Sequence, residues 1–428
     1  MSLQKKIQHW VVQASGVLFT QAGVQIIGAV TGLMLVRWMP KDEYAWLTIC
    51  GSLLATLGLL ADGGIGTAIT AMSGRVAGDR NALAQVADAC LSVRNRLSLI
   101  SLVLTLPPFY ILLTRSELSS GLAALVVGSA AVMLWPVTSS KFLPVTLRIA
   151  GHLKSTQIME LSGAILRCGL TAFVLAVSLR TVYPAFLATV ASIGLHAWLA
   201  GRGVRRVVGM ASGTETQRAE VWGFVRALYP NFVFSCVQGQ IATWIISFNS
   251  GLSEIADVGA LSRLAVFFSI FGSLFHYLIL PSLASTRSPV AVRTKFIISM
   301  TLISAGITIV AVSSWLFPEP FLWILGRGYS HLGGELPLVF IGQGLGMITG
   351  ASWIFMQVRG WVRLSWLNIP LTLAGYLLGV VVSDLTTVEG VLLMSAVSLL
   401  PPLLWVAVYI WHKLKRDIEI AGHESSDS

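Results

Sequence analysis

Charged side chains are scarce in this sequence. Only 11% of its 428 residues are Asp, Glu, Lys or Arg, whereas an average globular protein has about 25%. Hydrophobic residues make up 55% of the chain and fall into long apolar runs. A surface in contact with water needs more charge than this, so the composition excludes a soluble globular protein and predicts an integral membrane protein.

Motifs for several kinds of chemistry are also missing. The four cysteines are scattered, with no CxxC or His/Cys cluster, so we expect buried thiols and no metal site. No GxxxxGK[ST] motif is present, which excludes direct use of ATP to first order. A membrane polymerase or lipid-dependent glycosyltransferase needs a large catalytic outer loop. The longest expected outer loop, 318–335, carries Glu319 and Glu335 without an Arg/His/Asp set. We therefore expect no catalytic residues and no cofactor.

Twelve apolar stretches are long enough to cross a bilayer, which takes about 20 residues each. The fold class is therefore all-α and polytopic. The net charge of +10 is dispersed among these stretches, which indicates topology signals and no nucleic-acid partner. Most Lys and Arg residues fall on one set of loops, so the bias places both termini in the cytoplasm. The expected spans are 15–36, 46–73, 91–113, 119–143, 157–179, 183–203, 223–248, 256–284, 295–316, 336–357, 364–383 and 388–411.

The two halves of the chain resemble each other. Residues 147–157 superpose on 356–366, so that Gly151 meets Gly360 and Lys154 meets Arg363. This match suggests two six-helix lobes related by a pseudo-two-fold axis along the membrane normal, as in two-lobed transporters. The expected domains are a lobe at 1–206, a cytoplasmic linker at 207–222, a second lobe at 223–412 and a tail at 413–428.

The stretch 19–70 carries the most unusual residues of the first lobe. Gln21 and Gln25 lie one turn apart on the first span, so both point the same way. The second span ends in LLADGGIGTAIT, where Asp62 and three glycines interrupt the apolar run. A carboxylate at that depth is costly and indicates either a functional group or the cap of a broken helix.

Smaller patterns predict local contacts. Thr214 and Gln217 in the linker have the spacing of a capping box. Glycines at four-residue intervals predict close helix packing in the tenth and eleventh spans; they are Gly342, Gly346, Gly350, Gly375 and Gly379. Glu160 and Arg167 lie on one face of the fifth span, either as an ion pair or with a role in substrate binding.

The opening of the chain is similar to that of a known family. The segment RWMPKDEYA followed by LLADGGIGTAIT, the eighth-span opening EIADVGALSRLAVFF with its ending LILPSLAS, and the outer loop containing LGRGY together resemble bacterial polysaccharide flippases of the Wzx type. These belong to the multidrug/oligosaccharidyl-lipid/polysaccharide (MOP) exporter superfamily, which has a MATE-like fold. The sequence departs from the family at Leu261, where Tyr is frequent, and places Arg263 among small or apolar positions.

The resemblance implies a function and a set of site residues. It implies translocation of a polyprenyl-diphosphate-linked oligosaccharide from the cytoplasmic to the periplasmic leaflet of the bacterial inner membrane, for O-antigen, capsule or exopolysaccharide synthesis. A diphosphate requires cations, and sugars require amides and hydroxyls. The substrate-binding candidates are Arg263, Gln21, Gln25, Asn231, Gln238, Arg167, Arg148 and Lys154, and Asp62 is the ion-coupling candidate.

An alternative remains within the same fold, namely a cation-coupled antiporter of drugs or small molecules. Many such proteins use a carboxylate in the first span, where this chain has only amides. For either function we expect a monomer in contact with membrane lipid. The flippase would also have polysaccharide polymerase or assembly proteins as partners.

Overall fold

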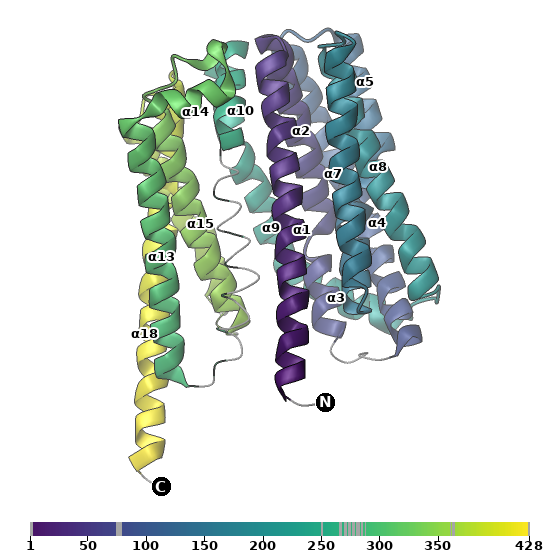
Figure 1. Ribbon diagram of the computed structural model, residues 1–428, viewed down its shortest axis with the longest axis vertical. Coiled ribbons are helices and arrows are strands. Elements are labelled where there is room, and N and C mark those ends of the chain that lie inside the picture. Colours follow the sequence, from purple (N-terminus) through teal and green to yellow (C-terminus); the bar gives the residue numbers. More distant parts are fainter. Residues whose placement is uncertain are drawn as a thin grey trace. The chain divides into compact units, whose positions relative to one another are not determined.

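In the computed structural model, all the regular secondary structure of the described residues is helical (Figure 1). These are residues 3–73, 79–249, 251–264, 288–359 and 364–426, with isolated positions at 268, 272, 275, 279, 283, 286 and 361. Gly360 and Arg363, which carry the predicted internal repeat, lie outside them, as does most of the predicted span 256–284.

The first part of the chain forms the helices α1 Leu3–Trp38, α2 Lys41–Asp62, α3 Ile65–Ser73, α4 Arg80–Arg115, α5 Ser120–Val132, α6 Leu134–Ile149, α7 Leu153–Ala176, α8 Val182–Val207, α9 Glu215–Asn249 and α10 Leu252–Leu264. The second part forms α13 Pro289–Leu316, α14 Pro318–Leu325, α15 Leu336–Val358, α16 Asn368–Val382, α17 Val388–Ser398 and α18 Leu400–Ser426, with short 3₁₀ turns at Arg327–Tyr329 and Ser365–Leu367.

Nine helical stretches among the described residues are long and apolar enough to cross a membrane, and α16 is a shorter apolar helix. This confirms a multi-pass membrane protein. The nine correspond in position to nine of the predicted spans, and α9 covers the predicted span 223–248.

Two of the predicted spans are broken by proline. The span expected at 119–143 is divided at Met133 into α5 and α6, and the span expected at 388–411 is divided at Leu399 into α17 and α18. Pro136 and Pro401–Pro402 follow the two breaks. A proline ring clashes with the carbonyl four residues earlier and supplies no N–H, which interrupts the hydrogen-bond ladder at this place.

The chain packs as two compact units, residues 26–259 and residues 1–25 with 260–428. In the 26–259 unit, α2 packs on α4, α6 on α8, α7 on α8 and α9 on α4. Buried aliphatic side chains from α3, α4, α6, α8 and α9 form its core, including Ile69, Leu97 and Val225. The predicted division into lobes at 207–222 stays a prediction.

Polar contacts fasten one end of the 26–259 unit. The Lys41 ammonium at the start of α2 lies 2.8 Å from an Asp257 carboxylate oxygen and donates to the Ser253 hydroxyl at 2.7 Å. The Glu43 carboxylate accepts a hydrogen bond from the Val182 backbone N–H at 2.6 Å. These contacts join the start of α2 to α10 and to the start of α8.

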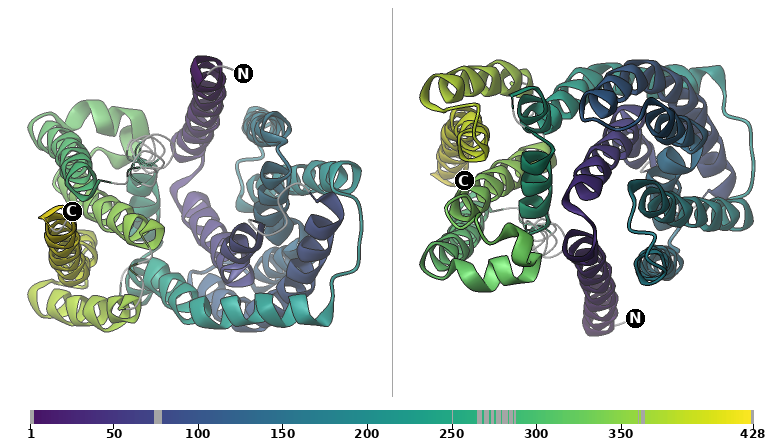
Figure 2. Two further views of the ribbon diagram at one scale, coloured as in Figure 1. Left: turned by 90° about the horizontal axis from the view of Figure 1, so that it is seen from below. Right: turned by 90° about the horizontal axis from the view of Figure 1, so that it is seen from above.

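The link between α8 and α9 runs without helix along the edge of the 26–259 unit (Figure 2). The predicted capping box at its end is confirmed. The Thr214 backbone N–H donates to Gln217 Oε1 at 2.9 Å, and the Gln217 N–H donates to Thr214 Oγ1 at 3.2 Å. These reciprocal bonds satisfy backbone groups that the first turn of α9 leaves unpaired.

In the other unit, α16 packs closely on α17 and α18. A Cβ added at Gly375 would lie 2.6 Å from the Ser398 carbonyl oxygen, and one at Gly379 would lie 2.9 Å from Met394 Cα. The predicted close packing at these two glycines is confirmed. On α15 the closest approach is at Gly344, where an added Cβ would overlap Ile307 of α13, whereas Gly342 and Gly346 have ordinary contacts at 3.7 Å and Gly350 has none within 4 Å. For α15 the predicted close approach is therefore absent only at Gly350.

Candidate functional site

The candidate site forms where the second apolar run breaks. α2 ends at Asp62, and Gly63 and Gly64 follow with φ of +48° and +93°. Only glycine adopts such angles without strain. The Asp62 carboxylate accepts hydrogen bonds from the backbone N–H groups of Gly64 and Gly66. The predicted role of Asp62 as the cap of a broken helix is therefore confirmed, because it satisfies the first N–H groups of α3.

Lys141 of α6 lies beside the turn that precedes Asp62. Its Nζ atom is 3.0 Å from the point where a Cβ of Gly58 would stand. Gly58 and Asp62 are one helical turn apart, which is about 6 Å along α2. Because Gly58 has no side chain, the ammonium can lie against the backbone of α2, from where it attracts the Asp62 carboxylate. The Lys141 side chain is itself exposed.

Arg94 of α4 is the second cation that acts on Asp62. It lies about 21 Å along α4 from Arg80, the first residue of the helix, and only 1% of it is exposed. Its Nη1 donates to the Ser139 hydroxyl of α6 at 2.9 Å, and its Nη2 donates to Asn95 Oδ1 at 3.1 Å. These bonds fix the guanidinium between α4 and α6.

Helix α9 covers the break. The ring of Tyr229 would lie 2.9 Å from a Cβ at Gly63, and the side chain of Leu228 would lie 3.0 Å from a Cβ at Gly64. Further along α9, the Cys236 thiol lies 4.0 Å from the Thr56 carbonyl oxygen of α2. The two glycines are therefore needed for the close approach of α9 as well as for their backbone angles.

The cluster, which we define as Asp62, Arg94 and Lys141, has two positive charges and one negative charge. Charged groups inside a membrane are costly and are retained where they are paired or functional. Asp62 compensates one cation, so the cluster keeps an excess of one positive charge, with Lys141 as its exposed member. Such an arrangement attracts anions such as phosphate.

The sequence interpretation missed Arg94 and Lys141 as site residues and counted both as topology signals. A signal for Arg94 was present. Leu83, Ala87, Cys90 and Arg94 follow one another at intervals of four, three and four residues, so Arg94 continues the apolar face of the helix. For Lys141 no local pattern was available, because its partner position Gly58 lies on another helix.

The predicted amides lie on two helices. Gln21 and Gln25 are half-buried on α1, and Asn231 and Gln238 are half-buried on α9. Asn231 Oδ1 is buried and accepts no hydrogen bond. Gln21 and Gln25 belong to one compact unit and the two α9 residues to the other, and their common role in binding substrate stays a prediction.

The predicted cations Arg148, Lys154 and Arg167 lie on α6 and α7. Arg148 forms an ion pair with Glu160 of α7, so its charge is compensated. Lys154 is exposed in the first turn of α7. Arg167 is half-buried further along α7.

Arg263 is half-buried near the end of α10. A structural account of this residue pairs it with Asp257 or Glu254. Asp257 forms an ion pair with Lys41, and Glu254 accepts the Gly251 backbone N–H at 3.0 Å. The role of Arg263 stays a prediction.

The fold of this chain, unlike its sequence, has matches among known proteins. No family model matches the chain, and no curated protein matches its sequence. An inward-facing multidrug resistance MATE family transporter of the MOP superfamily has a TM-score of 0.66 and 14% identity, over 92% of this chain and 96% of that one. The lipid II flippase MurJ, in an inward closed conformation, has a TM-score of 0.68 and 10% identity, over 92% and 87%. The eukaryotic MATE transporter AtDTX14 has a TM-score of 0.56 and 14% identity, over 96% and 98%.

The chain has the MOP fold. This confirms the predicted all-helical, two-lobed, MATE-like architecture. Within the MOP fold of this chain, the cluster belongs entirely to the 26–259 unit, since α2, α4 and α6 all lie there.

Proposed function

We propose that this protein translocates a polyprenyl-diphosphate-linked oligosaccharide across the bacterial inner membrane for surface polysaccharide synthesis. What carries the proposal is the position of Arg94 and Lys141, on helical stretches apolar and long enough to cross a membrane, near the single carboxylate of Asp62, so that the cluster has one more positive than negative charge. A transporter of organic cations would be expected to concentrate negative charge there. Support also comes from the likeness in fold to a lipid II flippase and from the resemblance of the opening segments to polysaccharide flippases.

The proposed contacts divide between the two parts of the substrate. Cations hold the diphosphate, first Lys141 and then Arg148, Lys154, Arg167 and Arg263 at other depths. The amides of Gln21, Gln25, Asn231 and Gln238 hydrogen-bond to the sugars, and the polyprenyl tail stays in the bilayer. Each phosphate contact has to be modest, because a site that binds too tightly releases its substrate slowly. Both termini lie in the cytoplasm, and the protein works as a monomer beside polymerase or assembly proteins.

A reconstitution experiment tests the substrate class. Purified protein in liposomes should make a labelled polyprenyl-diphosphate oligosaccharide accessible from the opposite leaflet, while liposomes without protein should not. Arg263→Ala should lower this rate by about tenfold if the guanidinium binds diphosphate, since a charge-assisted hydrogen bond is worth about 1.5–3 kcal/mol. Arg263→Lys should keep part of it, because lysine retains the charge but not the bidentate geometry.

Arg327→Ala is the matched control for Arg263, because Arg327 is exposed in a turn after α14. It should leave the rate unchanged. Counterflow of an organic cation without movement of the lipid-linked oligosaccharide would contradict the proposal and favour the antiporter.

The alternative, a cation-coupled antiporter, has one specific observation in its favour. Asp62 is a carboxylate at the end of a helix long and apolar enough to cross a membrane, and carboxylates within membrane spans can belong to ion or proton pathways. In the flippase, the same residue is the proposed site of ion coupling.

Replacing Asp62 by Asn separates its charge from its role as a cap. Asn keeps an oxygen that accepts the Gly64 and Gly66 N–H groups, so we expect thermal stability near the wild type. Asp62→Ala removes the cap as well and should cost about 1–2 kcal/mol. We expect both variants to transport slowly, because Lys141 and Arg94 lose their counter-charge. Measurements of flipping and of melting temperature check this, and normal flipping by the Asn variant would leave Asp62 with a capping role alone.

A further inference from the structure

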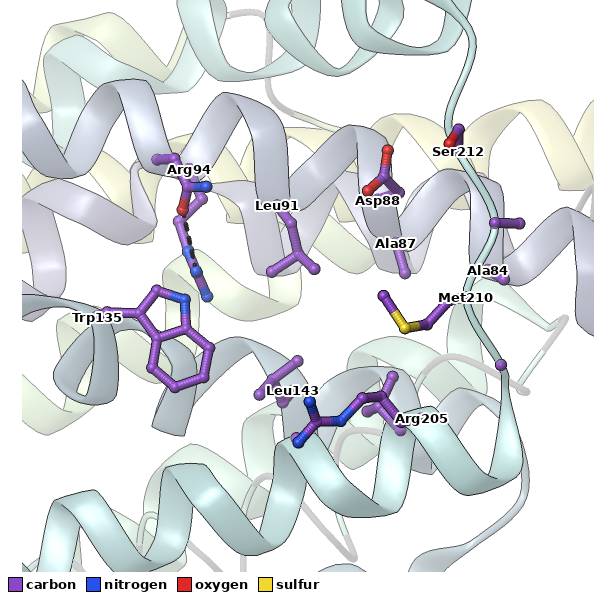
Figure 3. A pocket seen from close by; sticks show the side chains of 15 residues that line it. Ala84, Ala87, Asp88, Leu91, Arg94, Trp135, Leu143, Arg205, Met210 and Ser212 are labelled. Carbon is purple, nitrogen blue, oxygen red and sulfur yellow. Dashed lines mark hydrogen bonds between the residues drawn. The ribbon is translucent and has the colours of Figure 1, made fainter.

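A cavity of about 390 Å³ lies inside the 26–259 unit. It is bordered by α4, α6, α8 and the segment that follows α8 (Figure 3). Most of its wall is apolar, with Ala87 and Leu91 on α4, Leu143 on α6 and Val204 on α8. The cavity accordingly suits a ligand with a hydrocarbon portion.

Two guanidinium groups provide the positive charge of this cavity. Arg205 lies on the last turn of α8 and is exposed. Arg94 extends from α4 toward Trp135 (Figure 3). The residue is almost fully buried, and among the described parts of the chain its Nε–H has no hydrogen-bond acceptor. A buried N–H of this kind is a ready donor for an oxygen of a ligand.

The one carboxylate in the wall, Asp88, leaves the two guanidiniums with a net positive charge. Asp88 Oδ2 accepts the Gly213 backbone N–H at 2.9 Å and lies 3.7 Å from Nη2 of Arg218. Arg218 lies outside the cavity lining and is shared between Asp88 and Glu215, which is 2.6 Å from its Nη1. The groups left to face a ligand are the guanidiniums of Arg205 and Arg94, together with the polar side chains of Asn95 and Ser212.

The rim of the cavity has features typical of a membrane interface. Trp135 is 54% exposed and Met210 is 85% exposed. Outside the cavity lining but on the same helix, the guanidinium of Arg202 lies 5.2 Å from the ring centroid of Trp198. Tryptophan and basic residues gather at the level of lipid headgroups, and the positive-inside bias of the sequence predicts that this end of α8 faces the cytoplasm.

We infer that this cavity binds an anionic phospholipid of the surrounding leaflet. Arg205 at the rim holds the phosphate oxygens, the Arg94 Nε–H donates to an ester or phosphate oxygen, and the apolar wall holds the start of an acyl chain. This lipid is a resident ligand and not the transported substrate, so the inference does not rest on the proposed function. Because Arg94 also acts on Asp62, the bound lipid would share this guanidinium with the cluster.

Native mass spectrometry of the purified full chain tests the inference. The probes are phosphatidylglycerol and phosphatidylcholine with identical acyl chains, added at equal concentration. The wild type should retain phosphatidylglycerol preferentially. Arg205→Gln should weaken its tightest binding by about tenfold, which corresponds to the loss of one charge-assisted contact.

Arg206→Gln is the matched control. Arg206 is the next residue of α8, is exposed and does not line the cavity. It should bind phosphatidylglycerol like the wild type. Ala87→Leu, which places a larger side chain in the cavity without changing its charge, should lower the retention of both lipids, and thermal unfolding shows which variants are folded.

Several outcomes would overturn the inference. Equal binding of phosphatidylglycerol and phosphatidylcholine by the wild type is one. Equal losses in the Arg205→Gln and Arg206→Gln variants, which indicate general attraction to a basic surface, are another. A third is displacement of bound phosphatidylglycerol by millimolar inorganic phosphate alone, which would indicate a site for free anions and not for a lipid.

Discussion

Replacing Lys141 by Gln should lower the rate of translocation by about ten- to a hundredfold while leaving membrane insertion normal. A charge-assisted contact to a diphosphate is worth about 1.5–3 kcal/mol, and each 1.4 kcal/mol is about a factor of ten. Lys141 is exposed, so its removal leaves no cavity in a packed core. Lys141→Arg should retain part of the activity, because it keeps the charge beside Asp62.

Replacing Gly58 of α2 by alanine should displace the Lys141 ammonium without removing its charge, and replacing Gly51 is the control. A Cβ at Gly58 would lie 3.0 Å from Lys141 Nζ and 3.1 Å from its Cε, whereas a Cβ at Gly51 would meet nothing within 4 Å. Both replacements by alanine favour the helix by up to about 1 kcal/mol. Gly58→Ala should therefore slow translocation, and Gly51→Ala should not.

The measurement is the flipping assay with lipid-linked oligosaccharide, normalised to the amount of folded protein. Equal rates for Gly58→Ala and Gly51→Ala, together with an active Lys141→Gln variant, would remove Lys141 from the transport site. Loss of folded Lys141→Gln protein would indicate that the lysine serves to neutralise Asp62 during folding.

The second large effect is on stability and concerns Gly375. Gly375→Ala should lower the free energy of unfolding by about 1–3 kcal/mol, the usual cost of overpacking. The added methyl group would meet the Ser398 carbonyl oxygen at 2.6 Å and Ser398 Cα at 2.8 Å. These are backbone atoms, which cannot rotate away as a side chain can, so α16 would have to move.

Gly350→Ala on α15 is the control for this effect. A Cβ there meets nothing within 4 Å, and alanine favours the helix over glycine, so its melting temperature should be equal to the wild type or higher. Thermal unfolding of the purified variants in one detergent provides the comparison. A Gly375→Ala protein as stable as Gly350→Ala would show that α16 can shift at little cost.

Much of the architecture was accessible from sequence because the bilayer imposes it. A membrane span must satisfy its own backbone hydrogen bonds, so each long apolar run becomes a helix. Local chemistry was equally predictable where its partners are neighbours in the chain. Asp62 caps the helix that begins three residues later, and Thr214 pairs with Gln217. Both are side chain–backbone interactions within a single turn.

Contacts between helices were less predictable. Gly375 and Gly350 stand in similar small-residue patterns, but only Gly375 faces a neighbouring backbone closely. A small-residue pattern shows that another helix can pack closely there. The tertiary packing decides at which of these glycines a neighbouring helix does so. The proline breaks at Met133 and Leu399 illustrate the intermediate case: the prolines are visible in the sequence, but apolar runs on both sides concealed the interruption.

By itself the sequence determined that this is a membrane protein built of helices, and that a helix breaks at Asp62, since these follow from hydropathy and from interactions within a turn. Tertiary structure alone decided that Arg94 and Lys141 would act on that carboxylate. Both were counted as topology signals, and their roles depend on α4 and α6 packing around α2, with glycine at position 58 leaving room for an ammonium. Which charged groups from different helices lie near each other depends on how the helices pack, and the hydropathy of the sequence does not encode this packing.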